Sequence, residues 1–362
     1  MYICVYKDRQ NNVKTGDSKL KSAPCLPKTQ SSKTLRVINN IIKTGLPLLI
    51  AGSIMWWMYR GIDWSEIVQA AASPRCMLWM LASMPFGITA QVFRAMRWRL
   101  VLLPLGHEVR TGVLVNSIFL SYGSSLAIPR SGEVLRCGVV RKYEGVDFST
   151  LAGSVVAERV IDMAMIALLT AVTILSQIPV CLRFMDTTGM SMTAMLSRFT
   201  STGYIVTLIC ALLVIFTALK LASRLRFFQK VSNRLANFKE GMLSIRKVES
   251  LTLFLTYSIG IWLSYYLHFY VAFQCFDFTA DLGPTCALVA FVAGCFAVLV
   301  PTPNGAGPWH FAVKTVLMLY GVAGHLGAIF ALVVHTLQTL LVAILGLWSL
   351  IGLGMTKQLN NK

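Results

Sequence analysis

Long apolar runs alternate with short polar or basic segments along most of this chain. A helix needs roughly 20 consecutive apolar residues to cross a bilayer. Runs that approach this length predict six crossings, at residues 37–59, 77–93, 151–175, 204–219, 251–273 and 326–353. The second run leads into FRAMRWRLVLL, where Arg94, Arg97 and Arg99 are expected to stop the span at a membrane interface.

Two further apolar runs fall short of the roughly 20 residues of a full crossing and are interrupted by proline and glycine. Residues 113–128 lead into Pro129 and Gly132, and residues 286–300 lead into the segment PTPNGAGP. If both runs turn back, 27 of the 33 Lys and Arg residues lie on one side of the membrane. The positive-inside rule expects this bias on the cytoplasmic side. Both runs are therefore predicted to form re-entrant hairpins of broken helices.

The predicted fold is an all-α polytopic membrane protein with about six full transmembrane helices and two re-entrant broken-helix hairpins. Each half reads span, span, broken hairpin, span, and the two halves start on opposite sides. We therefore expect an inverted repeat, with halves at about 37–176 and 203–355, in one domain of residues 37–355. A Gly-Val pair follows each break, at Gly145 and Gly321, and supports the correspondence.

Two segments are predicted to lie outside the membrane core. Residues 1–36 are polar and basic without apolar periodicity, which is typical of a disordered cytoplasmic tail. Between residues 220 and 248, apolar positions recur at steps of three or four among basic residues. This pattern favours a basic amphipathic helix on the inner leaflet, with two packed helix extensions as the alternative.

Composition supports the membrane class and argues against nucleic-acid binding. Hydrophobic residues make up 56% of the 362 residues and charged residues 13%, against roughly 45–50% and 25% in soluble domains. The net charge of +18 is explained by basic cytoplasmic loops next to anionic lipids. We expect a multi-pass protein of the bacterial cytoplasmic (inner) membrane, with both termini cytoplasmic, membrane lipids as partners and no nucleic acid.

The first break carries the charges that most need an explanation. Backbone that is not helical at membrane depth must be buried in protein or line a wet cavity. A helix that restarts there presents free N–H groups and suits an anion. The segment AIPRSGEVLR supplies candidate head-group ligands: Arg130, Ser131, Gly132, Glu133 and Arg136.

Polar residues of two other segments complete the predicted site. Glu158, Arg159 and Asp162 lie near the middle of the span 151–175, where ionisable residues face a cavity or each other. They could bind substrate or form a salt bridge that clamps this helix to the hairpin, and both readings stay open. The second break adds Asn304, Gly305, Gly307 and His310. His335 could relay protons, but a histidine bonded to a neighbouring helix is favoured.

These motifs resemble a known family. IPRSGEVLRCGVVRKYEGVDFSTLAGSVVAERVIDM, with FRAMRWRLVL before it and PTPNGAGPWHFAV after it, is similar to the transmembrane family that includes the flippase-like region of lysylphosphatidylglycerol synthases. The likeness covers roughly residues 40–355. It implies an inner-membrane protein that moves or presents lipid, without the soluble aminoacyltransferase domain of the bifunctional members. His310 stands near the place where the family usually has an acidic residue.

The function expected from the residues and the resemblance is that of a flippase or translocase for a phospholipid or glycolipid with a polar or anionic head group. The alternatives are a membrane-embedded glycosyl- or group-transferase acting on a lipid carrier, and a structural partner of a lipid-modifying enzyme. The sequence has no nucleotide-binding or metal motif, so we favour a protein that is not an enzyme, with no cofactor, no metal and no catalytic residue. A homo-oligomer or a complex with a lipid-modifying enzyme stays open.

Overall fold

The computed structural model describes residues 45, 48–128, 131–177, 238–241, 243–244 and 248–356. All of them belong to the unit Thr44–Lys362. The predicted tail at 1–36, the predicted span at 204–219 and most of the predicted amphipathic segment at 220–248 lie outside the described residues.

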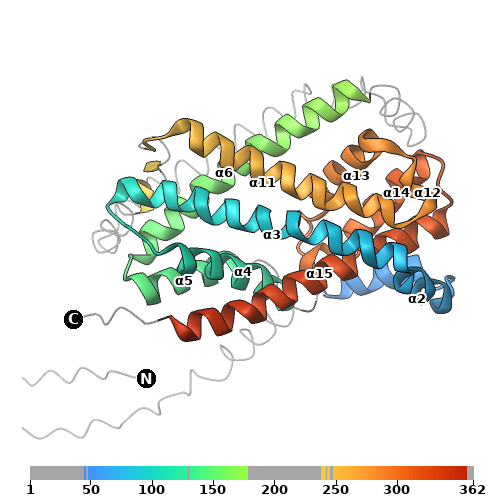
Figure 1. Ribbon diagram of the computed structural model, residues 1–362, viewed down its shortest axis with the longest axis horizontal. Coiled ribbons are helices and arrows are strands. Elements are labelled where there is room, and N and C mark those ends of the chain that lie inside the picture. The colour runs from blue at the N-terminus through green and yellow to red at the C-terminus, as the bar shows by residue number, and fades with distance from the viewer. Residues whose placement is uncertain are drawn as a thin grey trace, which may run out of the picture. The chain divides into compact units, whose positions relative to one another are not determined.

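The described residues form helices and the turns between them, and no β-strand occurs among them. A helix at Leu48–Tyr59 comes first. The labelled elements that follow are α2 (Trp64–Ala72), α3 (Pro74–Leu102), η1 (Leu103–Leu105), α4 (Thr111–Ala127), α5 (Gly132–Glu144), α6 (Phe148–Ser176), α11 (Leu251–Ala272), η3 (Phe273–Cys275), α12 (Asp277–Ala280), α13 (Gly283–Ala297), η4 (Pro303–Gly305), α14 (Pro308–Leu319) and α15 (Gly324–Met355) (Figure 1).

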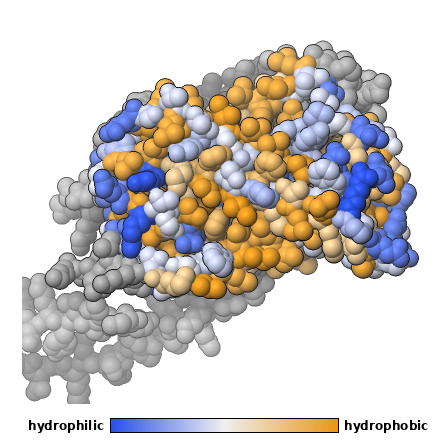
Figure 2. Space-filling model, viewed as in Figure 1, coloured by the Kyte–Doolittle hydropathy of each residue, from blue (hydrophilic) through white to orange (hydrophobic). Residues whose placement is uncertain are grey.

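Membrane-spanning helices form the body of the protein. In the described residues, three helical segments are long and apolar enough to cross a bilayer: Pro74–Leu105, Phe148–Ser176 and Gly324–Met355. Figure 2 shows hydrophobic residues over the middle of one face and hydrophilic residues gathered toward the two ends. These features confirm an all-α polytopic membrane protein.

Both predicted breaks separate two helices that pack against each other. α4 ends at Ala127 and α5 begins at Gly132, while α13 ends at Ala297 and α14 begins at Pro308. α4 contacts α5, and α13 contacts α14. Each short apolar run is therefore one arm of a helical hairpin, as the interrupted pattern predicts.

The two halves repeat the same order of elements and pack across each other. A long helix, a broken hairpin and a second long helix occur as α3, α4–α5, α6 and again as α11, α13–α14, α15. α3 and α11 lie side by side and run in opposite directions (Figure 1). The first hairpin packs on α15 through α4, and the second packs on α6 through α13. This order of elements agrees with the expected inverted repeat, whose halves stay a prediction because the span expected at 204–219 lies outside the described residues.

The Gly-Val pairs occupy equivalent places in the two halves. Gly145 follows α5 with φ 71°, and Gly321 follows α14 with φ 92°. Each is followed by a buried valine, Val146 or Val322, and then by a long helix. Because φ values in this range suit glycine, the two turns have the same local cause.

Two large clusters make up most of the apolar core, and a small third one joins Met58 and Tyr59 to Ala328. Near α2, Phe269, Phe273 and Phe330 pack together with the start of α3. Near α5, Trp98 and Leu114 belong to the second cluster, with the start of α6. The layer between these clusters contains the polar groups of the candidate site.

Candidate functional site

A cavity of about 250 Å³ lies between the two halves of the bundle. α3, α4, α11, η4, α14 and α15 all contribute to its wall. Its polar lining residues are Gln91, Tyr122, Tyr265, His268, Asn304, Trp309, His335, Gln338 and Thr339. Placing this many amide, hydroxyl and imidazole groups inside a membrane protein costs free energy unless they contact water or a polar ligand.

Asn304 is held in the second break by two hydrogen bonds to α15. Its φ of 50° is the one positive value at a non-glycine residue in the described chain. The side-chain amide donates to Thr339 Oγ1 at 2.6 Å. Nε2 of His335 donates to the Asn304 carbonyl at 3.1 Å, since a carbonyl can only accept. His335 thus bonds a neighbouring segment, as the sequence favours, and it also lines the cavity.

His310 faces the break from the first turn of α14. Its Nδ1 accepts a hydrogen bond of 3.2 Å from the Gly307 N–H, and its ring centroid lies 4.5 Å from that of His335. The backbone N–H of Gly307 is therefore already occupied. Of the four residues expected at this break, Asn304 lines the cavity, whereas Gly305, Gly307 and His310 support the turn behind it.

The first break serves close packing between α4 and α5. A side chain at Gly132 would place its Cβ 2.3 Å from the Ser121 carbonyl oxygen and 2.5 Å from the Ser121 hydroxyl. Ser131 donates to the Ser124 carbonyl at 3.2 Å. Gly132 thus permits the approach of another helix. Arg130 and Pro129 lie outside the described residues.

Asp162 is the centre of a buried ion network. It lies in the middle of α6 and binds α3 through both carboxylate oxygens. Arg94 Nη1 donates to Oδ2 and Arg97 Nη2 donates to Oδ1, each at 2.7 Å. Arg159 Nη1 adds a third hydrogen bond of 3.2 Å to Oδ2. Asp162 therefore ties α3 to α6 in the membrane interior.

Glu158, one turn earlier on α6, connects the same network to α5. Arg136 Nη1 donates to Glu158 Oε2 at 2.9 Å, and the Arg136 guanidinium lies 4.7 Å from the centroid of the Trp98 ring. Arg97 Nε is 3.5 Å from Glu158 Oε1. Trp98 is held in turn by a 2.9 Å hydrogen bond from Nε1 to Ser154 Oγ. Stacking and ion pairing together orient Arg136.

A more exposed pair closes the outer edge of this network. Arg159 Nε and Glu133 Oε1 are 2.7 Å apart, and both side chains are more than a third exposed. Glu133, Arg136, Glu158, Arg159 and Asp162 therefore all join the first hairpin and α3 to α6. The structure brings these five predicted residues together as the clamp that the sequence offered as one of two readings.

The buried part of the network carries an excess of positive charge. Among the described residues, Arg94, Arg97 and Arg136 are at most 3% exposed and face two buried carboxylates, Glu158 and Asp162. Nη2 of Arg136 finds no hydrogen-bond partner within the described chain. A buried cation that exceeds its counter-ions favours the approach of an anion.

Tyr265 connects the network to the cavity. The Arg94 guanidinium lies 6.0 Å from the centroid of the Tyr265 ring. Tyr265 shares a hydrogen bond of 3.0 Å between hydroxyls with Tyr122, and both tyrosines line the cavity. The polar cavity and the positive network are thus neighbouring parts of one candidate site.

Arg94 and Arg97 are the residues that sequence reasoning missed. They were expected to stop a span at an interface, but α3 continues through both to Leu102, and both are buried. Their shared carboxylate partner, Asp162 on α6, lies 68 residues after Arg94 and 65 after Arg97. The signal that could have found them is spacing: arginines three apart on one helix match the acids four apart at Glu158 and Asp162.

Comparisons with known proteins agree with a lipid-related membrane class. The family model for the lysylphosphatidylglycerol synthase TM region matches residues 46–346. The chain is also similar to glycosyltransferase AglD of Haloferax volcanii, with 28% identity over 134 residues, or 37% of this chain. That match spans only 21% of the relative's own length. No solved structure matches the chain.

Proposed function

Since this chain belongs to the family of the lysylphosphatidylglycerol synthase transmembrane region, we propose that it is a lipid translocase. Its substrate is a phospholipid or glycolipid with an anionic or polar head group. The head group enters the cavity between the two hairpins while the hydrocarbon chains stay in the bilayer.

The observation that carries this proposal is the polar cavity with a net positive network beside it. Gln91, Tyr122 and Tyr265 line the cavity on the side of α3, α4 and α11. Arg94 lies behind Tyr265. Hydroxyl and amide groups can replace the water that a head group loses on entering the membrane. The excess of one buried arginine supplies attraction for a phosphate or another anion.

The packing between the two halves suggests how the halves could move relative to each other during transport. Each hairpin contacts the last long helix of the other half, α4 with α15 and α13 with α6. In transporters built from inverted repeats, one repeat rocks against the other around a site near the midplane. The ion network holds α3, α5 and α6 together, so these helices would move as one body while the cavity opens to alternate sides.

The second candidate function is group transfer to a lipid carrier, which similarity to glycosyltransferase AglD favours. Glu133, Glu158 and Asp162 would be the candidate general bases. Each pairs with at least one arginine. These contacts occupy carboxylate oxygens that a general base needs free to accept a proton. The geometry therefore supports transport better than proton abstraction.

The distribution of charge supports a proposal for the membrane in which this occurs. The bias of Lys and Arg toward one side supports a cytoplasmic membrane with both termini on the cytoplasmic side. The bacterial inner membrane is the proposed location. Contacts with a second copy or with a lipid-modifying enzyme would be compatible with the exposed apolar surface of α15.

Reconstitution in sealed vesicles tests the proposal. The purified protein is inserted into vesicles that carry fluorescent phosphatidylglycerol, and the fraction of probe exposed on the outer leaflet is followed with a membrane-impermeant quencher. Movement of unmodified lipid between leaflets supports translocation. A new lipid product, detected by mass spectrometry after addition of activated sugar donors, would support the transferase instead. Vesicles that show neither effect would contradict both functions.

A further inference from the structure

Two buried cysteines lie in contact at the α2 end of the bundle, outside the candidate site. Cys76 belongs to the first turn of α3, and Cys275 is the last residue of η3. The Cys275 thiol donates a hydrogen bond of 3.7 Å to the Cys76 carbonyl oxygen, and the two thiols also interact with each other. Each half of the protein thus contributes one thiol to a pair.

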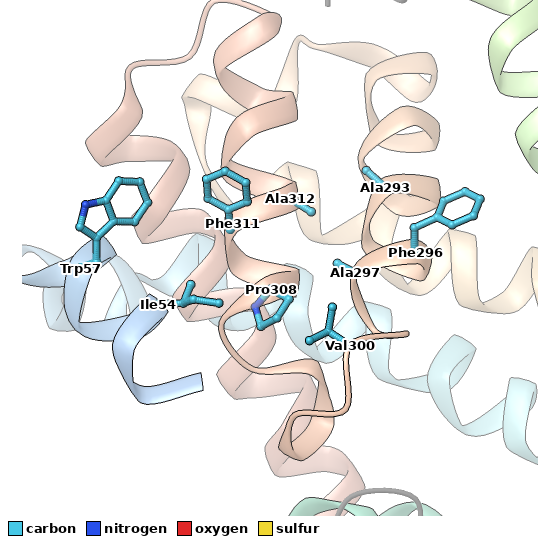
Figure 3. Close-up of a pocket in the computed structure, with 9 residues that line it drawn as sticks. All are labelled: Ile54, Trp57, Ala293, Phe296, Ala297, Val300, Pro308, Phe311 and Ala312. Atoms are coloured by element: carbon cyan, nitrogen blue, oxygen red, sulfur yellow. The ribbon is translucent and has the colours of Figure 1, made fainter. Parts of the chain in front are cut away.

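The pair differs chemically from the other regions outside the candidate site. A groove between the helix Leu48–Tyr59, α13 and α14 is lined by apolar side chains alone and holds no reactive group (Figure 3). Cys137 on α5 and Cys286 on α13 are also buried, but neither contacts another thiol within the described chain. These two cysteines therefore serve as internal references for the pair.

Arg75 holds the two backbones next to the thiols. Its Nε donates to the Gln274 carbonyl oxygen at 2.8 Å, and its guanidinium pairs with Asp277. Gln274 precedes Cys275, just as Arg75 precedes Cys76, so this contact brings the two cysteines opposite each other. A disulfide needs an S–S distance of about 2.05 Å. Thiols that already touch can reach it by a change of side-chain rotamer.

The charge around the pair indicates the side of the membrane on which it lies. The flanking segments, residues 60–76 and 273–283, contain two basic and four acidic side chains: Arg60, Arg75, Asp63, Glu66, Asp277 and Asp281. Because the excess of Lys and Arg marks the cytoplasmic side, this end is expected to face away from the cytoplasm. Thiols on that side meet oxidants, whereas cytosolic thiols are kept reduced.

Burial determines when such a bond can form. The side chains of Arg75 and Asp277 are 42% and 92% exposed, so water lies close to the pair along the chain. Cys76 and Cys275 themselves are 0% and 3% exposed. A protein oxidant therefore reaches them only before this end of the bundle has packed, and a reductant is excluded afterwards.

We propose that Cys76 and Cys275 form a disulfide in the mature protein and that this bond joins the two halves at the α2 end. During insertion, the thiolate of one cysteine attacks the disulfide of an oxidised thiol–disulfide exchange protein. The thiolate of the other then attacks the first cysteine's sulfur in the mixed disulfide. One S–S bond forms and one breaks, and the oxidant leaves as two thiols with the two protons and two electrons.

The bond has a structural consequence for both halves. It links residues 199 positions apart and so restricts the unfolded chain. In the folded chain it fixes the start of α3 to the segment that follows α11, and these two helices already pack side by side (Figure 1). The inference goes beyond the proposed function, because it does not depend on which molecule the protein moves.

Differential alkylation of the full chain tests the bond. The chain is expressed in a bacterium whose extracytoplasmic thiol oxidation is intact. Cells receive N-ethylmaleimide before lysis, and the protein is denatured in the same reagent, reduced and labelled with deuterated N-ethylmaleimide. By mass spectrometry we expect at least roughly tenfold more deuterated than ordinary label on Cys76 and Cys275, and the reverse on Cys137 and Cys286. Ordinary label on either Cys76 or Cys275 would overturn the proposal.

Alanine variants identify the partner of each thiol. Cys76→Ala should move Cys275 to the ordinary label, and Cys275→Ala should do the same for Cys76. Cys286→Ala is the matched control from the same apolar cluster and should leave both labels unchanged. Deuterated label that persists on the remaining cysteine would show a different partner and overturn the pairing. Should a variant fail to reach the membrane, the linked peptides of the unaltered chain, detected without reduction, identify the partner instead.

Melting temperatures in detergent separate a bond from two packed thiols. Cys76→Ala and Cys275→Ala should each melt roughly 5 °C or more below the unaltered protein. The double variant should melt within about 2 °C of the single ones, because the first substitution already breaks the bond. Additive losses would show two independently packed side chains and overturn the bond. Neither labelling nor melting involves lipid movement, so a failure of the proposed function leaves both results intact.

Discussion

Arg97 on α3 donates a hydrogen bond of 2.7 Å from Nη2 to Oδ1 of Asp162 on α6, and Arg97 is completely buried. Arg94 binds the other oxygen of the same carboxylate. One aspartate is thus the shared counter-ion of two arginines inside the membrane. This arrangement fixes α3 against α6 and makes Asp162 the residue on which the stability of the network most depends.

Asp162→Asn removes the charge of this carboxylate and keeps its volume. Two buried arginines would lose their shared counter-ion, and breaking a buried ion pair from one side costs about 3–5 kcal/mol. We expect a strongly lowered melting temperature in detergent, measured by intrinsic tryptophan fluorescence. Glu133→Gln is the control, because its pair with Arg159 is half exposed and exposed pairs contribute about 0–1 kcal/mol. Equal melting of both variants would contradict this assignment.

Gly132→Ala tests the first break by the space it requires. The added Cβ would lie 2.3 Å from the Ser121 carbonyl oxygen, and overpacking of this kind costs about 1–3 kcal/mol. Gly138→Ala on the same helix meets nothing within 4 Å and should stabilise α5 by up to about 1 kcal/mol. Melting temperatures of the two variants should move in opposite directions. A drop in both, or in neither, would show that α4 and α5 pack differently.

The parts of this architecture that local chemistry dictates could be predicted from sequence. Proline and glycine at residues 129–132 and 301–308 interrupt the two apolar runs, so both breaks follow from backbone rules. The distribution of Lys and Arg then predicts that the runs turn back. Glu158 and Asp162 were recognisable because charge is rare inside a span. These signals need no knowledge of which helices become neighbours.

The partners of those residues could not be predicted in the same way. Arg94 and Arg97 resemble interfacial arginines when α3 is considered alone, and only the approach of α6 makes their burial tolerable. His310 and His335 lie on different helices, and the 4.5 Å between their rings results from the turn at Asn304. Tertiary packing determines both arrangements, and it cannot be predicted from the sequence of one helix alone.

Asn304 variants separate backbone conformation from hydrogen bonding at the second break. Asn304→Gly keeps the left-handed conformation and loses the bond to Thr339. Asn304→Ala loses the bond and adds a steric cost of about 1–2 kcal/mol. We expect the alanine variant to melt lower and to move lipid more slowly than the glycine variant. Thr339→Val removes the acceptor and also the 3.5 Å contact of Thr339 Oγ1 with His335 Nδ1, so it should melt no higher than the glycine variant. Identical behaviour of Ala and Gly would mean that the positive φ is not needed.

Arg94→Gln tests whether the excess positive charge selects the head group. Arg94 is the network arginine that lies against Tyr265 of the cavity. Its replacement leaves Arg97 paired with Asp162. The number of buried arginines in the network then equals the number of buried carboxylates. Because the lost interaction acts on an anion in the cavity, movement of phosphatidylglycerol should fall at least about tenfold relative to phosphatidylcholine, or about 1.4 kcal/mol. The measured quantity is the ratio of the two rates in vesicles, which cancels any general loss of folded protein.

Arg159→Gln is the control at the exposed edge and should leave the ratio unchanged. If Arg94→Gln slows both lipids equally, the arginine acts only as a structural clamp, and the selectivity for anionic lipids must come from another part of the chain.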